Sequence, residues 1–192
     1  MNELQKELET NQMEQEEQLS EIRKTNEVFS NKYKRIGVEI SENQKSVSFR
    51  KGCRVCCEKI YSKGIHEIEY QIEGFSNPNN DRNRIEIGVV VPERRETLIN
   101  VNHDWAGTFW FRTWWQNNEP SSWKGKDGSS LEKYGKPIKK GDRFTILLNM
   151  DEKELSFSIN NYNYGIAFNN LPEKVSLFIL AWRERGNKIS LI

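Results

Sequence analysis

The sequence lacks the features that mark secreted, membrane-spanning or nucleic-acid-binding chains. Its cysteines are three, an odd number, and they crowd into residues 53–57, so a disulfide framework is not expected. No apolar run approaches the roughly 20 residues that span a bilayer, and the acidic, polar amino terminus is unlike a secretory signal. The formal net charge is +1, so neither nucleic acid nor an anionic membrane is an expected partner. These absences favour a soluble protein in a reducing, cytoplasmic setting.

Patterns that carry catalysis or metal binding are missing as well. The histidines are His66 and His103, far apart in sequence, and the Cys53-x-x-Cys56 spacing would need a second ligand pair to hold zinc. On a strand, Cys53 and Cys57 face one way and Cys56 the other, which favours buried free thiols. No nucleophile elbow or similar local motif surrounds a Ser or Cys. We therefore expect no enzyme activity, no cofactor and no metal.

The amino-terminal region has the composition of a helix. Residues 1–29 contain no Gly or Pro and are rich in Glu, Gln and Lys, with eight Glu against three basic residues, a net charge of −5. A heptad placed on Leu19 and Ile22 gives a seam that is half polar, which is weak for a coiled coil. Two interpretations stay open: a solvated helix that packs on the body, or a coiled-coil arm that makes a homodimer through residues 1–29. We place the arm at residues 1–31 and the body at 32–192.

The body alternates apolar and polar residues with a period of two, the pattern of antiparallel strands that are buried on one face. Helical periodicity does not return after Lys32. The sequence therefore predicts an all-β sandwich of two antiparallel sheets, preceded by an amino-terminal α-helix. Two polar stretches, 75–84 and 116–133, are expected to be loops. The expected buried positions include Ile36, Val38 and Ile40; Ile68, Tyr70 and Ile72; Ile85, Ile87, Val89 and Val91; Phe144, Ile146 and Leu148; Leu155, Phe157 and Ile159; Val175, Leu177, Ile179 and Ala181; Ile189 and Leu191.

Five of the six tryptophans lie between Trp105 and Trp123. In a strand that covers residues 108–115, Phe109 and Phe111 point one way, whereas Trp110 and Arg112 point the other. One interpretation is that most of these rings are core. The other is that Trp105 and one further ring form an exposed aromatic anchor, with Arg112 stacked on indole rings.

Several short motifs, in order, resemble the SPRY domain family. Gly141-Asp142 opens a strand, Leu155-Ser-Phe157 leads to an Asn-rich turn, and Gly165-Ile166-Ala167-Phe168 follows. Other matching pieces are Gly64-Ile-His66-Glu-Ile-Glu69, Ile87-Gly88-Val89, Tyr134-Gly135, 177–182 and 188–191, and residues 38–47 are similar to the PRY segment that often precedes SPRY. The resemblance covers about Lys34 to Ile192. The chain departs from the family pattern at Ile68, Asn149 and Asn161, and we expect Asn161 to tolerate a left-handed backbone.

The resemblance implies a bent, concanavalin-like sandwich without a catalytic centre, whose edge loops bind a protein or peptide. Matched by position, the candidate partner-binding residues are Arg82, Arg84, Asn102, Trp105, Tyr134, Trp182 and Arg183. Guanidinium groups there suit an acidic or carboxamide-rich peptide. A coiled coil before PRY–SPRY also resembles the tail of tripartite-motif proteins, but the Cys and His pairs of a RING are missing upstream, so ligase activity is not carried over. The alternatives are a substrate-recognition part of a ubiquitin-ligase assembly and a lectin-like sandwich, since Trp and Asn-rich loops also suit sugars.

Overall fold

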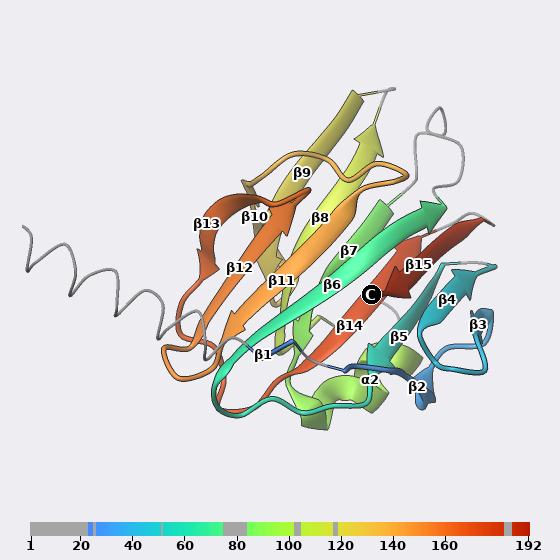
Figure 1. Ribbon diagram of the computed structural model, residues 1–192, viewed down its shortest axis with the longest axis horizontal. Coiled ribbons are helices and arrows are strands. Elements are labelled where there is room, and N and C mark those ends of the chain that lie inside the picture. Colours follow the sequence, from blue (N-terminus) through green and yellow to red (C-terminus); the bar gives the residue numbers. More distant parts are fainter. Residues whose placement is uncertain are drawn as a thin grey trace, which may run out of the picture.

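Two β-sheets packed face to face form the body of the protein (Figure 1). The structure is a computed structural model, and it describes residues 23–24, 26–50, 52–74, 84–101, 105–116, 119–182 and 186–192. Within these residues, one sheet has eight strands, in the order β13-β12-β11-β6-β15-β4-β3 with β1 paired to β6, and the other has seven, in the order β10-β9-β8-β7-β14-β5-β2. The pairings among the described strands are antiparallel except that of β1 with β6. The predicted all-β sandwich is therefore confirmed.

The strands match most of the predicted alternating segments. The eight-stranded sheet contains β1 Arg23–Lys24, β3 Val38–Ile40, β4 Ser46–Phe49, β6 Ile65–Gly74, β11 Arg143–Asn149, β12 Glu154–Ile159, β13 Tyr162–Phe168 and β15 Asn187–Leu191. The seven-stranded sheet contains β2 Phe29–Lys34, β5 Cys53–Cys57, β7 Arg84–Val90, β8 Thr108–Gln116, β9 Glu119–Lys126, β10 Ser129–Lys133 and β14 Ser176–Trp182.

The main core fills the space between the two sheets. Phe144 of β11 and Phe157 of β12 meet Phe111 of β8, with ring centroids 5.2 to 5.8 Å apart. Removing such a ring from water stabilises the fold by about 2 kcal/mol. Most of the predicted alternating positions contribute to this core; among them are Ile68, Tyr70, Ile72, Ile85, Ile87, Val89, Leu155, Leu177, Ile179 and Ile189.

Side-chain amides shape the turns of the SPRY-like stretch. Asn149 Oδ1 accepts hydrogen bonds from the backbone amides of Asp151 (3.2 Å) and Glu152 (3.1 Å), so it supplies the same acceptor as the Asp usual at that place. Asn160 and Asn161 have φ angles of 50° and 66°. The expectation that Asn161 tolerates a left-handed backbone is therefore confirmed.

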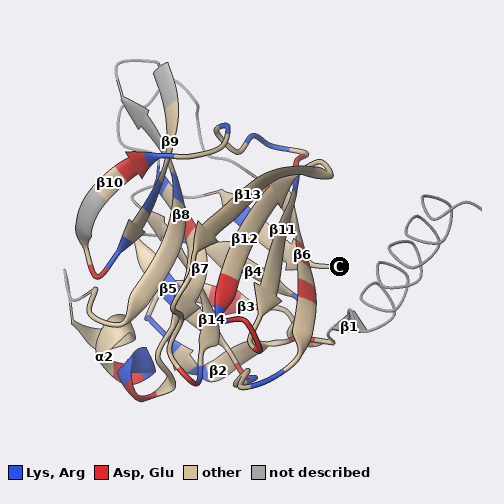
Figure 2. Ribbon diagram, turned by 90° about the vertical axis from the view of Figure 1, so that its left-hand side faces the viewer, with Lys and Arg blue, Asp and Glu red and all other residues tan. Residues whose placement is uncertain are grey.

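A short helix on the seven-stranded sheet was not predicted. The 3₁₀ turn η1, Pro92–Arg94, leads directly into α2, Arg95–Asn100. Leu98 and Ile99 pack on the face of the sheet that points away from the main core, and Figure 2 shows the place of α2 against the strands. Six residues with two buried apolar side chains are too few to show a helical period, so the pattern gave no signal beyond Pro92 at a helix start.

The last part of the expected helical arm belongs to the sandwich, which corrects the predicted boundary at residue 31. Arg23 and Lys24 pair in parallel with His66 and Glu67 of β6, and β2 already begins at Phe29. Residues 1–22 lie outside the described residues, so the helix there, and the homodimer through residues 1–29, stay predictions.

Glu27 and Phe29 anchor this segment, and both are fully buried. Glu27 accepts hydrogen bonds from the Tyr61 hydroxyl (2.5 Å) and from the backbone amides of Val28 (2.9 Å) and Lys59 (3.2 Å). In a Glu-rich segment, this carboxylate looked like one more solvated helix residue. Burial with three donors shows instead that it holds the chain against the body.

Two other expectations are wrong. Ile36 is 97% exposed, because the chain turns there, with the Val38 amide bonded to Arg35 O at 3.1 Å. In the stretch 116–133, residues 119–133 form the β9–β10 hairpin rather than a loop. The alternation typical of a strand is missing from this stretch, because the inward positions of β9, near the open side of the sandwich, carry Lys124 and Lys126 instead of apolar residues. Of the other expected loop, 75–84, residues 75–83 lie outside the described residues.

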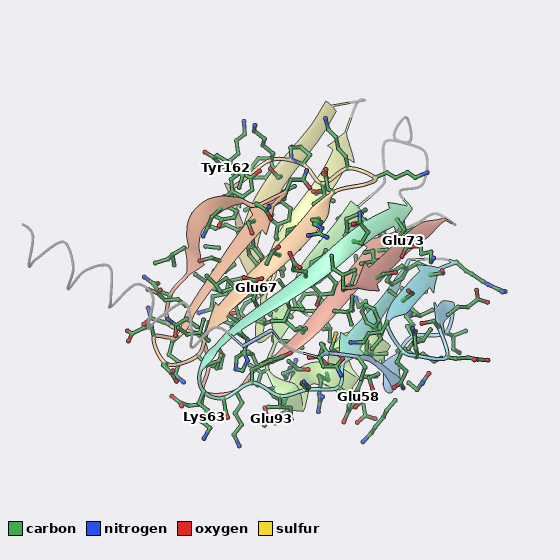
Figure 3. The ribbon with its side chains drawn as sticks, in the orientation of Figure 1. Glu58, Lys63, Glu67, Glu73, Glu93 and Tyr162 are labelled. Atoms are coloured by element: carbon green, nitrogen blue, oxygen red, sulfur yellow. The ribbon has the colours of Figure 1, made fainter. Side chains whose placement is uncertain are left out.

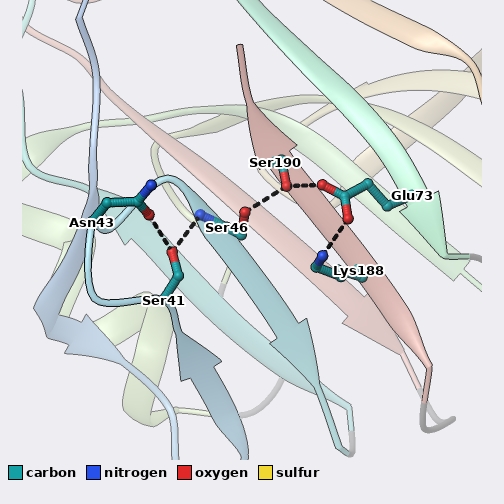
Figure 4. Close-up of polar contacts among 6 residues, drawn as sticks. All are labelled: Ser41, Asn43, Ser46, Glu73, Lys188 and Ser190. Atoms are coloured by element: carbon teal, nitrogen blue, oxygen red, sulfur yellow. Dashed lines mark hydrogen bonds and ion pairs between the residues drawn. The ribbon is translucent and has the colours of Figure 1, made fainter.

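A chain of polar contacts crosses the eight-stranded sheet from Glu73 of β6, which is labelled in Figure 3, to the turn after β3 (Figure 4). Ser190 donates to Glu73, and Lys188 forms an ion pair with the same carboxylate. Ser46 Oγ lies 2.6 Å from Ser190 Oγ, and the Ser46 amide donates to Ser41 Oγ at 3.0 Å. These contacts tie β15 to both of its neighbours.

Glu73→Gln tests this network through pH. Hydrogen bonds from Lys188, and then from Ser190, hold the pKa of Glu73 below its usual range. A depressed folded-state pKa adds stability above the unfolded pKa, about 4.3, and that stability is lost as pH falls through the folded value. We expect urea unfolding to show the variant less stable near pH 7 by well under about 1 kcal/mol, since a third of the side chain is exposed. The difference should close below about pH 4; a constant difference at all pH values would contradict this.

Candidate binding surface

The register of the seven-stranded sheet arranges its outer face, the one turned away from the main core, in rows. Residues paired across antiparallel strands point to the same side of the sheet. The first row runs Cys56, Phe178, Gly88, Trp110 and Gly125 from β5 to β9. The second runs Arg54, Leu180, Glu86, Arg112 and Trp123, and the third contains Trp182 and Arg84.

The first row is a small apolar core of its own. Trp110 is buried, and its ring lies on Gly125, where an added Cβ would come within 2.3 Å of the indole. Half-buried Trp105 covers Trp110, with ring centroids 6.3 Å apart. The Trp105 carbonyl accepts a hydrogen bond from Thr108 Oγ1 (2.5 Å), which fixes the segment before β8.

Arginines interleave with these indoles. The Arg112 guanidinium lies 4.1 Å from the Trp110 ring centroid, and that of Arg84 lies 5.0 Å from Trp182 and 5.8 Å from Trp105. Such cation–π contacts contribute about 0.5–2 kcal/mol each, depending on burial. We call Arg84, Glu86, Trp105, Trp110, Arg112 and Trp182 the Trp–Arg cluster.

Arg54, beside the cluster, has a structural role. It donates to the carbonyls of Leu98 (2.6 Å) and Val101 (2.8 Å), so it satisfies carbonyls at the carboxyl end of α2.

A buried carboxylate lies at the centre of the cluster. Glu86 is fully buried, with Oε1 2.5 Å from Arg112 Nε and 2.9 Å from Arg84 Nε. Burial lowers the pKa of Arg84, Glu86 opposes that shift, and the charge of Arg112 adds to it. Because two guanidinium groups share one carboxylate, the described residues leave positive charge at a surface where Arg84, with 18% of its side chain exposed, reaches solvent. Glu86 was not among the predicted site residues, because the alternating pattern of β7 placed it on the face expected to meet solvent.

The structure brings some of the predicted site residues together. Arg84, Trp105 and Trp182 meet, although they come from three separate segments of the chain. Tyr134 lies elsewhere: its hydroxyl donates to Gly165 O (2.6 Å), its ring packs on Phe111 and Phe157, and burial raises its pKa to about 12. The other three candidates lie outside the described residues: Arg82, Asn102 and Arg183.

The three cysteines are buried free thiols, as predicted. Cys53 and Cys57 belong to the main core and Cys56 to the outer cluster, which confirms the predicted sides. Burial raises the pKa of Cys56 to about 12, so its nucleophilic thiolate form is scarce at neutral pH. Among the residues that the structure describes, no three His, Cys, Asp or Glu side chains are grouped as metal ligands.

A pocket of about 340 Å³ lies between β9, β10 and the end of β13. Its polar side chains are already paired in part, since Lys124 donates to Ala167 O at 2.9 Å and lies 3.2 Å from Glu132. This pocket lacks the aromatic and guanidinium combination of the Trp–Arg cluster.

Within the described part of the chain, no helix is long and apolar enough to cross a membrane.

Comparison with known proteins identifies the family. The model of the SPRY domain matches residues 67–192, and the chain belongs to the SPRY domain family. Among solved structures, the chain is similar to the SPRY domain of human HERC1, with a TM-score of 0.67 and 14% identity, over 85% of this chain and 96% of that one. It is also similar to the TRIM65 PSpry domain, with a TM-score of 0.64 and 15% identity, over 93% of this chain and 97% of that one. No curated protein matches the sequence.

Proposed function

We propose that this protein is a non-catalytic interaction module that binds a short peptide or an exposed loop of a partner protein through the Trp–Arg cluster. SPRY domains are a family of protein-interaction modules. The observation that carries the proposal is the contact of Arg84 with both half-buried indoles, Trp105 and Trp182. Tryptophan and arginine dominate binding hot spots, because they bury a large area at a modest entropic cost.

The rigidity of this surface also supports binding. All members of the cluster except Trp105, which precedes β8, belong to β7, β8 and β14, neighbouring strands inside the sheet, whose opposite face carries the main core. A rigid surface loses little conformational entropy when a ligand binds. Positive charge around Arg84 favours ligands with carbonyl, carboxamide or carboxylate oxygens.

Point variants of the full chain test this surface. Peptides selected from a random display library against the wild-type protein should bind Arg84→Ala and Trp182→Ala at least about tenfold more weakly, the loss of a hot spot of about 1.4 kcal/mol or more. Arg50→Ala is the matched control, since Arg50 is an exposed arginine paired with Glu39 in the β3–β4 hairpin. Equal binding by folded Arg84→Ala and Trp182→Ala would place the site elsewhere. Selective binding to a glycan array, without peptide binding, would favour the lectin-like alternative.

A further inference from the structure

Three polar atoms at the centre of the Trp–Arg cluster make no hydrogen bond within the described part of the chain, and one of them, Arg84 Nε, is still held in an ion pair 2.9 Å from Glu86 Oε1. The other two have no such contact. Glu86 Oε2 and Trp110 Nε1 are both buried without a hydrogen-bond partner. A buried polar group that stays unsatisfied is costly, so native proteins seldom retain one without a bound water, ion or ligand to complete it. Two in one cluster indicate a place that another molecule completes.

The two atoms have opposite requirements, and they belong to side chains that both contact the guanidinium of Arg112. Arg112 is 2.5 Å from the other oxygen of Glu86 and 4.1 Å from the Trp110 ring centroid. Glu86 Oε2 needs a donor, whereas the Trp110 indole N–H needs an acceptor. A group that completes both must therefore donate and accept at once.

This requirement discriminates among the side chains that a peptide can present. An ionised carboxylate only accepts, so it would leave Glu86 unsatisfied and place a like charge beside it. An ammonium only donates and would meet the charges of Arg84 and Arg112. A carboxamide has an NH₂ that donates and a carbonyl that accepts, and its planar shape fits against guanidinium and indole planes. A hydroxyl also does both, but with one donor and no planar surface.

We propose that the Trp–Arg cluster recognises a carboxamide side chain, Asn or Gln, which enters beside Trp105 and Trp182, donates to Glu86 Oε2 and accepts from Trp110 Nε1 or from the guanidinium groups. This inference rests on the proposed function, and it narrows the class of peptide ligand to those that present Asn or Gln to the cluster. It also assigns Glu86 a role in specificity: the buried carboxylate excludes acidic side chains that the arginines alone would attract.

A matched peptide set tests the inference. The strongest binder from the display selection is synthesised with its critical position changed among Asn, Gln, Asp, Glu, Ser and Ala, and binding to the full wild-type chain is measured by fluorescence anisotropy. We expect the better carboxamide peptide to bind at least about tenfold tighter than its acidic counterpart and the Ser peptide. Glu86→Gln should remove this preference and bring the Asp or Glu peptide to equal or tighter binding. Glu39→Gln, which alters an exposed carboxylate paired with Arg50, should leave the ratio unchanged.

A measurement on the wild-type chain covers the case in which Glu86→Gln fails to fold. The ¹H–¹⁵N signal of the Trp110 indole, assigned with Trp110→Phe, should move when the carboxamide peptide is added and stay in place with the Ala peptide. Tighter binding of the acidic or Ser peptide, or an unmoved Trp110 signal, would overturn the carboxamide inference but leave peptide binding intact. If no peptide is selected at all, both proposals fall.

Discussion

A chain that starts at Lys32 is expected to lose its cooperative thermal transition. The deletion removes Glu27 and Phe29, which are fully buried, and leaves the Tyr61 hydroxyl and the Lys59 amide without their acceptor. Loss of a buried Phe costs about 3–5 kcal/mol, and loss of the acceptor for the buried Tyr61 hydroxyl costs a further 1–3 kcal/mol or so. The sum reaches much of the roughly 5–15 kcal/mol by which folded domains are stable.

The matched control is a chain that starts at Arg23, which retains every contact described for this segment. Circular dichroism melting curves should show its transition near that of the full chain. Phe29→Ala and Glu27→Ala, made singly in the full chain, should each lower the midpoint by several degrees. A cooperative, unshifted transition in the chain that starts at Lys32 would show that residues 27–31 are dispensable.

Gly88→Ala is expected to destabilise the protein by about 3 kcal/mol or more, because overpacking against fixed backbone cannot relax. An added Cβ would come within 2.0 Å of Phe109 O and 2.7 Å of Trp110 Cα, which are backbone atoms of the neighbouring strand β8. Separating β7 from β8 would disturb the main core on one face and the Trp–Arg cluster on the other.

Gly141→Ala separates this clash from ordinary backbone strain. A Cβ there would meet nothing within 4 Å, but its φ of 91° is unfavourable for alanine, so we expect a loss of only about 1–2 kcal/mol. Urea unfolding of both variants measures the difference. Similar losses in the two would show that β8 moves aside from Gly88 at little cost.

The sequence predicted best where local pattern and tertiary environment agree. In β11 and β12 the apolar residues recur at every second position, because these inner residues face a closed core; they are Phe144, Ile146, Leu148, Leu155, Phe157 and Ile159. At the open side of the sandwich, alternation did not reveal the strand β9, since Lys124 and Lys126 occupy its inward positions. Alternation of apolar and polar residues arises where one face of a strand is buried. A strand whose inner face is only half covered therefore shows little alternation.

The candidate site was partly predictable for a related reason. Arg84, Trp105 and Trp182 were matched by motif position, and the structure brings them into contact. Glu86 could not be found this way, because its role depends on which strands pair and in what register with Arg112. Glu27 was hidden in the same way, since its partner Tyr61 lies 34 residues away.

The parallel pairing of β1 with β6 has a practical consequence for probes of this protein. Arg23 and Lys24 lie in the eight-stranded sheet, whereas the Trp–Arg cluster lies on the outer face of the seven-stranded sheet. A fluorophore, affinity handle or fused protein joined ahead of Arg23 is therefore tethered on the reverse of the molecule. Immobilisation through that end should leave the tryptophans facing the solution.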